Sequence, residues 1–162
     1  MLQDLFYVKQ SLGKDGNPIR VYKLMTIDPS NSPPADCSYD VYGHPIDDPG
    51  ISKLAAFMRR RHLDEFPQIY NIFRGDMKLV GIRPMSEYAW ERYPEDLKVE
   101  ALKHKPGLLG VQYAFPMEGD FDDHVAHLRQ YLDERGQSPF MTEMRYAVKI
   151  LVNELFRGVI SS

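Results

Sequence analysis

Pro67 is the residue that most constrains the fold of this chain, because it lies inside the motif Leu63-Asp64-Glu65-Phe66-Pro67-Gln68. A proline costs a helix nothing in its first turn but disrupts a helix interior. The motif therefore predicts a helix that starts here. The free N–H groups and the positive end of the dipole at such a start favour ionised carboxylates and can hold a phosphate.

The two carboxylates of this motif, Asp64 and Glu65, are predicted to do different work. Adjacent residues on a helix point about 100° apart, so one carboxylate could attack a substrate while the other holds a metal ion. Three consecutive arginines, Arg59 to Arg61, precede them, and at most two of these can face one site. The simpler alternatives are an acidic helix cap and a solvated basic helix face.

Composition places the chain among single-domain globular proteins. Its 162 residues are 43% hydrophobic, which is enough for one domain spanning residues 1–162. The formal charge of −3 argues against general attraction to nucleic acid. A single cysteine, Cys37, excludes an internal disulfide and a Cys-based zinc site and favours a reducing, cytoplasmic setting. No apolar stretch approaches the roughly 20 residues that span a bilayer.

The residue pattern predicts a mixed α+β fold that is rich in amphipathic helices and has a small antiparallel sheet. Leu5–Val8 and Ile19–Tyr22 flank a turn, which indicates a β-hairpin. Residues 28–50 are dense in Pro, Ser, Asp and Gly and indicate a long surface loop. A buried strand is expected over Met77–Ile82, and an extended segment over Leu108–Phe115. Helices are expected over residues 48–61, 63–75, 87–103, 121–135 and 138–158.

The last of these helices carries an apolar stripe that permits two interpretations. One face is formed by Met141, Met144, Val148, Leu151, Val152 and Leu155. Core packing is the usual use of such a stripe. The alternative is a face that meets a membrane surface or a partner protein.

Several motifs together resemble one protein family. Their order and spacing resemble the bacterial sugar transferases, the monotopic polyprenyl-phosphate phosphoglycosyl transferases, and the segment Phe6–Lys23 resembles the first hairpin of that family. The motifs that carry the resemblance are Leu63–Gln68, Asn71, Arg74–Met77, Val80–Pro84 and Lys105–Gly107. The resemblance implies transfer of a phosphosugar from a nucleotide-diphosphate sugar, commonly a UDP-sugar, to a polyprenyl phosphate. This reaction begins the assembly of polysaccharides or glycans.

The resemblance also implies a role for individual residues. Asp64 would be the nucleophile that forms a covalent phosphosugar intermediate, and Glu65 would be a ligand of Mg²⁺. Carboxylate attack divides a displacement between two anions into two steps, and Mg²⁺ prefers carboxylate and phosphate oxygens. The expected substrate-binding residues are Arg59, Arg83, Lys105 and Gln68. Lys105 also fits an ordinary turn lysine without a function.

The chain departs from the family pattern where basic residues are expected. Met25 and Gly50 stand at two such positions, and their loss weakens the expectation of diphosphate binding. Further departures occur at Ile82, His62 and Leu109. They favour an alternative, in which the chain is a non-catalytic relative that binds a nucleotide-sugar or a protein partner. A nucleic-acid binder using Arg59 to Arg61 is disfavoured by the acidic balance of the chain.

Family members have an apolar N-terminal membrane helix, and this chain begins where that helix would end. Contact with a bilayer would then depend on amphipathic helices, on basic residues and on Trp90. The expected location is the cytoplasmic face of the inner membrane, as a peripheral or monotopic protein.

Overall fold

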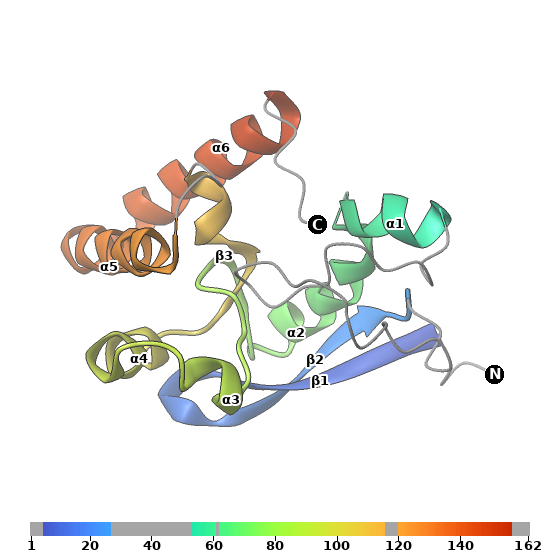
Figure 1. The fold of residues 1–162 in the computed structure, drawn as a ribbon, viewed down its shortest axis with the longest axis horizontal. Coiled ribbons are helices and arrows are strands. Elements are labelled where there is room, and N and C mark those ends of the chain that lie inside the picture. The colour runs from blue at the N-terminus through green and yellow to red at the C-terminus, as the bar shows by residue number, and fades with distance from the viewer. Residues whose placement is uncertain (1–4, 27–52, 61, 116–119, 157–162) are drawn as a thin grey trace.

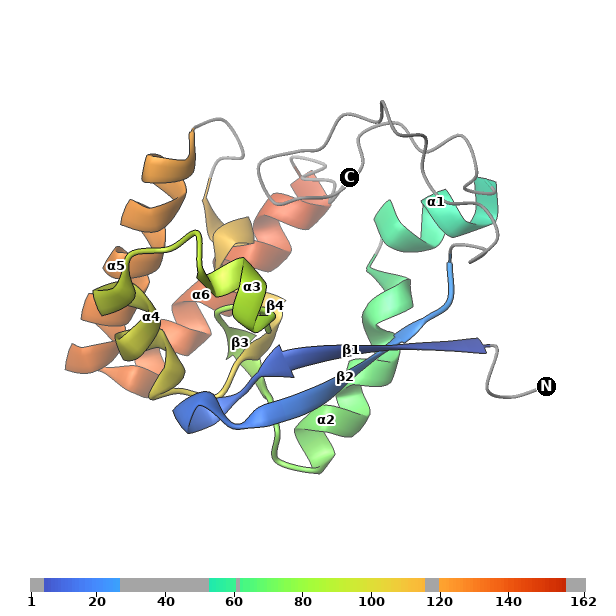
Figure 2. The same cartoon turned by 60° about the horizontal axis from the view of Figure 1, so that its bottom comes forward.

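A long β-hairpin spans the molecule and joins two groups of helices (Figures 1 and 2). The structure is a computed structural model that describes residues 5–26, 53–60, 62–115 and 120–156. The expected loop at 28–50, with Cys37 and the start of the first helix, lies outside these ranges. None of the helices within them is both long enough and apolar enough to cross a bilayer.

The hairpin confirms the sequence prediction, and its strands are longer than expected. Strand β1 (Phe6–Leu12) pairs antiparallel with β2 (Pro18–Leu24), with Phe6 opposite Leu24 and Leu12 opposite Pro18. A single 3₁₀ turn over Lys14–Gly16 closes it, and both Asp15 and Gly16 adopt positive φ there. Glycine takes this backbone conformation at little cost, which explains the Asp-Gly pair at the turn.

The first group of helices follows the hairpin and carries the Pro67 motif. It comprises α1 (Lys53–Arg60), the 3₁₀ helix η3 (Leu63–Gln68) and α2 (Ile69–Phe73). The motif therefore forms a separate 3₁₀ helix, and the α-helix begins only after Pro67. His62, which precedes the motif, has a φ of 52°. The predicted helix start with both carboxylates in its first turn is confirmed, but this turn is 3₁₀ and not α-helical.

Hydrogen bonds of the Asn71 side chain connect α2 to the hairpin. Its side chain is fully buried, and its amide donates a 2.6 Å hydrogen bond to the Arg20 carbonyl while accepting a 3.4 Å bond from the Tyr22 N–H. The backbone carbonyl of Asn71 accepts from the N–H groups of Asp76 and Met77. One residue thus joins β2, α2 and the chain that leads into the next strand.

A second, parallel sheet was not expected from the sequence. Strand β3 (Lys78–Gly81) confirms the predicted buried strand, and it pairs with β4 (Gly107–Gly110). The strands approach so closely that a Cβ atom on Gly107 would lie 2.1 Å from the Gly81 nitrogen. After Gly110 the chain turns into the 3₁₀ helix η4 (Val111–Ala114), so the extended segment expected over Leu108–Phe115 was only partly right.

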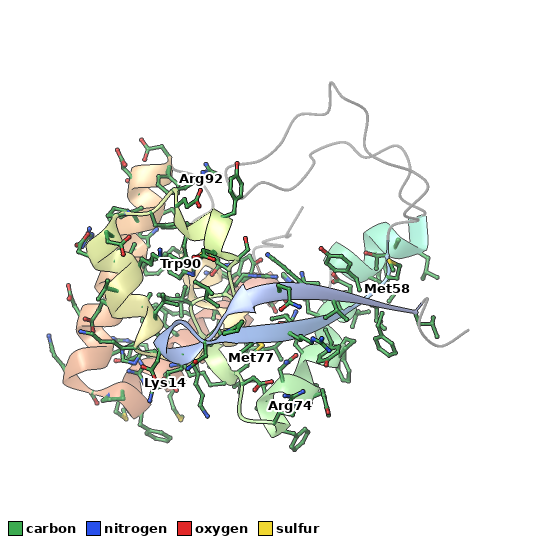
Figure 3. The ribbon with its side chains drawn as sticks, turned by 90° about the horizontal axis from the view of Figure 1, so that it is seen from below. Lys14, Met58, Arg74, Met77, Trp90 and Arg92 are labelled. Atoms are coloured by element: carbon green, nitrogen blue, oxygen red, sulfur yellow. The ribbon has the colours of Figure 1, made fainter. Side chains whose placement is uncertain are left out.

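The connection between β3 and β4 contains two helices where one was predicted. They are α3 (Glu87–Trp90) and α4 (Glu95–Leu102), and Pro94 caps the second. A proline inside a continuous helix would remove a hydrogen bond and clash with the preceding turn, which explains the break. Trp90 and Leu97 are buried as the helical spacing predicted. The expectation that Trp90 contacts a bilayer was wrong, because its side chain packs in the core. Figure 3 shows Trp90 within this part of the molecule and Arg92 at its edge.

Two long helices complete the fold, and the second presents a different face from the one expected. Helix α5 (Phe121–Gln137) starts with a capping box between Asp120 and Asp123, and α6 (Pro139–Phe156) packs against it. The buried positions of α6 are Thr142, Tyr146, Ile150 and Asn153. The expected core stripe is exposed, with exposed fractions between 44% and 64% for Met141, Met144, Val148, Leu151 and Val152. The core interpretation of that stripe was wrong; the side chain of Leu155 lies outside the described residues.

Replacing Asn71 with Ala should destabilise the fold by about 2 to 4 kcal/mol, because buried backbone groups on β2 would lose their partners. Urea denaturation followed by circular dichroism measures the change. The control is Asn17→Ala, which removes one exposed hydrogen bond to the Lys14 carbonyl and should cost less than about 1 kcal/mol. Equal denaturation midpoints for Asn71→Ala and the unmodified protein would contradict this role.

Candidate functional site

The two carboxylates of η3 are buried beside the hairpin. Asp64 is 8% exposed and Glu65 is 5% exposed, although charged side chains are rarely buried without partners. They are brought here because η3 packs against β2. A buried acidic pair of this kind is stable only where cations or hydrogen-bond donors compensate for lost hydration.

Two cations from distant parts of the chain bind Glu65. Lys23 on β2 places its Nζ 2.8 Å from Glu65 Oε1, and a terminal nitrogen of Arg83 donates to the same oxygen. Burial opposes ionisation of Glu65, but Arg83 and then Lys23 outweigh it and lower the pKa of Glu65 to about 2. Glu65 is therefore ionised throughout the physiological range.

Arg83 is held in place from both sides. It lies two residues after the end of β3. Its second terminal nitrogen donates a 2.5 Å hydrogen bond to the Tyr113 hydroxyl, and the guanidinium lies 5.5 Å from the Tyr113 ring centroid. Burial works against the charged form, but Glu65 and, more weakly, Asp64 raise the pKa of Arg83. Arg83 thus remains charged at the centre of the site.

A cavity of about 290 Å³ opens next to this ion-paired cluster. Its walls come from both strands of the hairpin, from α3, from η4 and from α5. Lys23 and Arg83 reach it from the Glu65 side, and Gln68 lines it as well. The Gln68 Nε2 is buried and has no hydrogen-bond partner among the described residues, so the amide can donate to an oxygen of a bound molecule.

The predicted site residues are only partly brought together. Arg83 and Gln68 line this cavity, and Glu65 lies beside it through its ion pair with Arg83. Asp64 is adjacent to Glu65 in η3. Lys105 instead lines a separate cavity of about 20 Å³, so its role in substrate binding stays a prediction. Arg59 belongs to α1, but its side chain is outside the described residues.

Three residues of the site were not singled out by the sequence. They are Lys9, Lys23 and Tyr113. Alternation along paired strands puts Lys9 and Lys23 on one face of the hairpin, and this signal was present in the sequence. Tyr113 gave no such signal, because the segment containing it was expected to be extended.

His62 occupies a further position next to the pair. Its ring centroid lies 5.0 Å from that of Tyr113, and its Nε2 is 3.7 Å from a carboxylate oxygen of Glu154 on α6. Burial is the main reason that the pKa of His62 is lowered. The departure from the family pattern at this position therefore adds a partly buried imidazole between η3 and α6.

The acidic pair fits a magnesium ion that is shared with a phosphate ligand. Mg²⁺ in proteins is often held by one or two carboxylates together with substrate phosphates, and an ionised Glu65 beside Asp64 meets that need. Within the described ranges, no group of three or more His, Cys, Asp or Glu side chains converges on one point. The remaining ligands would have to come from substrate or water.

Comparison with known proteins agrees with the motifs. A family model described as bacterial sugar transferase matches residues 2–155. The galactosyl transferase CpsE of Streptococcus agalactiae is 40% identical over 90 residues, which cover 54% of this chain and 20% of that protein. A putative undecaprenyl-phosphate N-acetylgalactosaminyl 1-phosphate transferase of Bacillus subtilis is 34% identical over 93 residues, covering 56% of this chain and 48% of that protein.

A third relative matches more of the chain. The undecaprenyl-phosphate galactose phosphotransferase of Salmonella typhimurium is 32% identical over 130 residues, which cover 74% of this chain and 27% of that protein. The chain thus matches less than half the length of each of these three relatives.

Replacing Glu65 with Gln should flatten the dependence of stability on pH between about pH 4.5 and 2. Folding lowers the pKa of Glu65 from 4.5 to about 2, so its ionised form stabilises the fold above pH 4.5 and this contribution, on the order of 3 kcal/mol, is lost as the pH falls towards 2. Urea denaturation at a series of pH values measures it. Glu87→Gln, the same change on an exposed side chain, is the control, and parallel curves for Glu65→Gln and the unmodified protein would refute the assignment.

Proposed function

Because this chain belongs to the bacterial sugar transferase family, we propose that it transfers a phosphosugar from a nucleotide-diphosphate sugar to a polyprenyl phosphate. A UDP-sugar is the proposed donor. The observation that carries this proposal is the buried Asp64-Glu65 pair, whose partners Lys23 and Arg83 open onto the cavity. A site with carboxylates and fixed cations suits phosphoryl transfer, in which positioning and charge stabilisation do most of the work.

In the proposed reaction, the carboxylate of Asp64 attacks the phosphorus that bears the sugar. The bond from this phosphorus to the bridging oxygen breaks, and the nucleoside monophosphate leaves with the electron pair. An oxygen of the polyprenyl phosphate then attacks the same phosphorus and releases Asp64 as a carboxylate. Arg83 and Lys23 stabilise the negative charge that develops on the phosphate oxygens, and the Gln68 amide donates to one of them.

Mg²⁺ is part of the proposal, with Glu65 as the protein ligand. When bound, the ion would offset the charge of the diphosphate. Glu65 already forms ion pairs with Lys23 and Arg83. A metal ion bound to Glu65 would therefore weaken these two ion pairs and leave both cations more able to contact phosphate oxygens.

The lipid acceptor requires that a membrane lie close to Asp64. The exposed apolar side chains of the first helical group offer a surface that could bind it. Several large apolar residues around η3 are exposed; they are Leu54, Phe57, Leu63, Phe66, Tyr70 and Phe73. Phe66 follows the acidic pair directly and Phe73 is 86% exposed. In the proposed arrangement this surface lies on the cytoplasmic face of the inner membrane, where its rings enter the interface.

Intact-protein mass spectrometry tests the covalent step. The protein mixed with Mg²⁺ and a panel of nucleotide-sugars should gain the mass of one phosphosugar with the correct donor, and the nucleoside monophosphate should be released. Asp64→Asn should give no adduct, because its amide is a poor nucleophile. Asp122→Asn, the same change at an exposed residue, should form the adduct as the unmodified protein does.

Two outcomes would change the proposal. An adduct on Asp64→Asn would move the nucleophile to another residue. Failure to form an adduct with any donor, for folded protein supplied with a membrane mimic, would favour the alternative of a non-catalytic relative that binds a nucleotide-sugar or a partner.

Replacing both Phe66 and Phe73 with Ser should reduce the affinity for anionic vesicles by up to about a thousandfold, because each ring that enters the interface contributes on the order of 2 kcal/mol. Co-sedimentation with phosphatidylglycerol vesicles measures the bound fraction. Val99→Ser, on the exposed side of α4, is the control and should bind as the unmodified protein does. Equal binding by the double variant would exclude this surface as the membrane contact.

A further inference from the structure

Lys9 is a third cation of the cavity, and the reaction as described does not use it. It lies on β1 and lines the same cavity as Lys23 and Arg83. Residues opposite one another on paired strands point to the same side, as do residues two apart along a strand. Lys9 is opposite Val21, and Tyr7 is opposite Lys23, so the two lysines are diagonal neighbours on the face of the hairpin that meets the cavity.

The ammonium group of Lys9 has no counter-charge of its own. Within the described part of the chain, no hydrogen bond or ion pair reaches it, whereas Lys23 and Arg83 both bind Glu65. Burial lowers the pKa of Lys9, and the nearby charges of Lys23 and Arg83 lower it further; only Glu65 acts in the opposite direction. A half-buried cation next to two others is destabilised unless an anion joins the group.

The walls of the cavity point to an anion as this missing partner. The described residues that line it include four basic side chains, Lys9, Lys23, Arg83 and Arg92, and no acidic one. His124, at the far end, adds no charge, because burial and then His127 lower its pKa to about 4. Three of the four cations come from the hairpin and from the end of β3, so positive charge is concentrated at the end near Glu65.

We propose that Lys9 binds the diphosphate of the sugar donor directly, as a third cationic contact beside Lys23 and Arg83. This inference rests on the proposed function for the identity of the donor. A diphosphate has more oxygens than Arg83 and Lys23 can contact while they also hold Glu65, and an ammonium group suits the remainder as a point charge. Lys9 acts as a binding residue here, and the reaction at phosphorus stays with Asp64.

Isothermal titration calorimetry with inorganic pyrophosphate, in buffer containing Mg²⁺, tests Lys9 without requiring turnover. Lys9→Met should weaken pyrophosphate binding by about ten- to a hundredfold, the usual effect of losing one hydrogen bond to a charged group. Lys9→Arg keeps the charge and should restore most of the affinity. Lys14→Met is the matched control, because Lys14 is an exposed lysine at the tip of the same hairpin (Figure 3) and should have no effect.

A structural role for Lys9 predicts a different result. Since the side chain of Lys9 makes no hydrogen bond or ion pair within the described residues, Lys9→Met should leave the urea denaturation midpoint unchanged or raise it, while the affinity falls. A parallel fall in midpoint and affinity would assign Lys9 to the fold and overturn the inference. The same holds if Lys9→Met binds pyrophosphate as tightly as the unmodified protein, or if the unmodified protein does not bind pyrophosphate.

The inference and the proposed function fail in different experiments. If pyrophosphate binding depends on Lys9 but no nucleotide-sugar gives an adduct on Asp64, the diphosphate site stands and the transfer reaction does not. If the adduct forms while Lys9→Met leaves pyrophosphate affinity unchanged, the reaction stands and the role of Lys9 is refuted.

Discussion

The ion-paired cluster of Lys23, Glu65 and Arg83 is the interaction on which the arrangement of the site depends. It brings together a strand of the hairpin, the 3₁₀ helix η3 and the end of β3, three segments that are far apart in the sequence. Burying Glu65 and partly burying the two cations costs hydration energy, which is recovered only where geometry and further hydrogen bonds are favourable. The Tyr113 hydroxyl on Arg83 supplies one such bond. The cluster thus provides fixed charges beside the cavity before any ligand binds.

Patterns of neighbouring residues correctly predicted those elements whose formation depends on nearby residues in the sequence. The hairpin follows from alternating residues around an Asp-Gly turn, and the burial of Trp90 and Leu97 follows from helical spacing. The pairing of β3 with β4 could not be predicted in this way, because it depends on the close approach of Gly81 and Gly107. The position of η3 also has a non-local cause, since β2 packs against it.

The error on α6 has a clear physical reason. This helix attaches to the domain largely through polar groups: Glu143 pairs with Lys78 and Arg135, and the Asn153 amide donates a 2.9 Å hydrogen bond to the Tyr113 carbonyl. Tyr146 and Ile150 complete the buried face. An apolar stripe marks the core only when apolar packing is the main attachment. Because polar contacts orient α6, its most apolar face is left on the surface.

The same distinction applies to the candidate site. Arg83 and Gln68 of the family motifs line one cavity, and Glu65 binds Arg83 beside it. The absence of a cation at Met25 nevertheless suggested weaker binding of a diphosphate. That comparison treats each position separately, whereas the charge of a cavity is the sum over every strand that lines it. Lys9 lines the cavity from β1, so the strand that pairs with β2 contributes positive charge even though Met25, just after β2, does not. Electrostatic attraction depends on distance and burial rather than on the strand that carries the charge. A missing basic residue in a motif therefore does not by itself establish that anion binding has been lost.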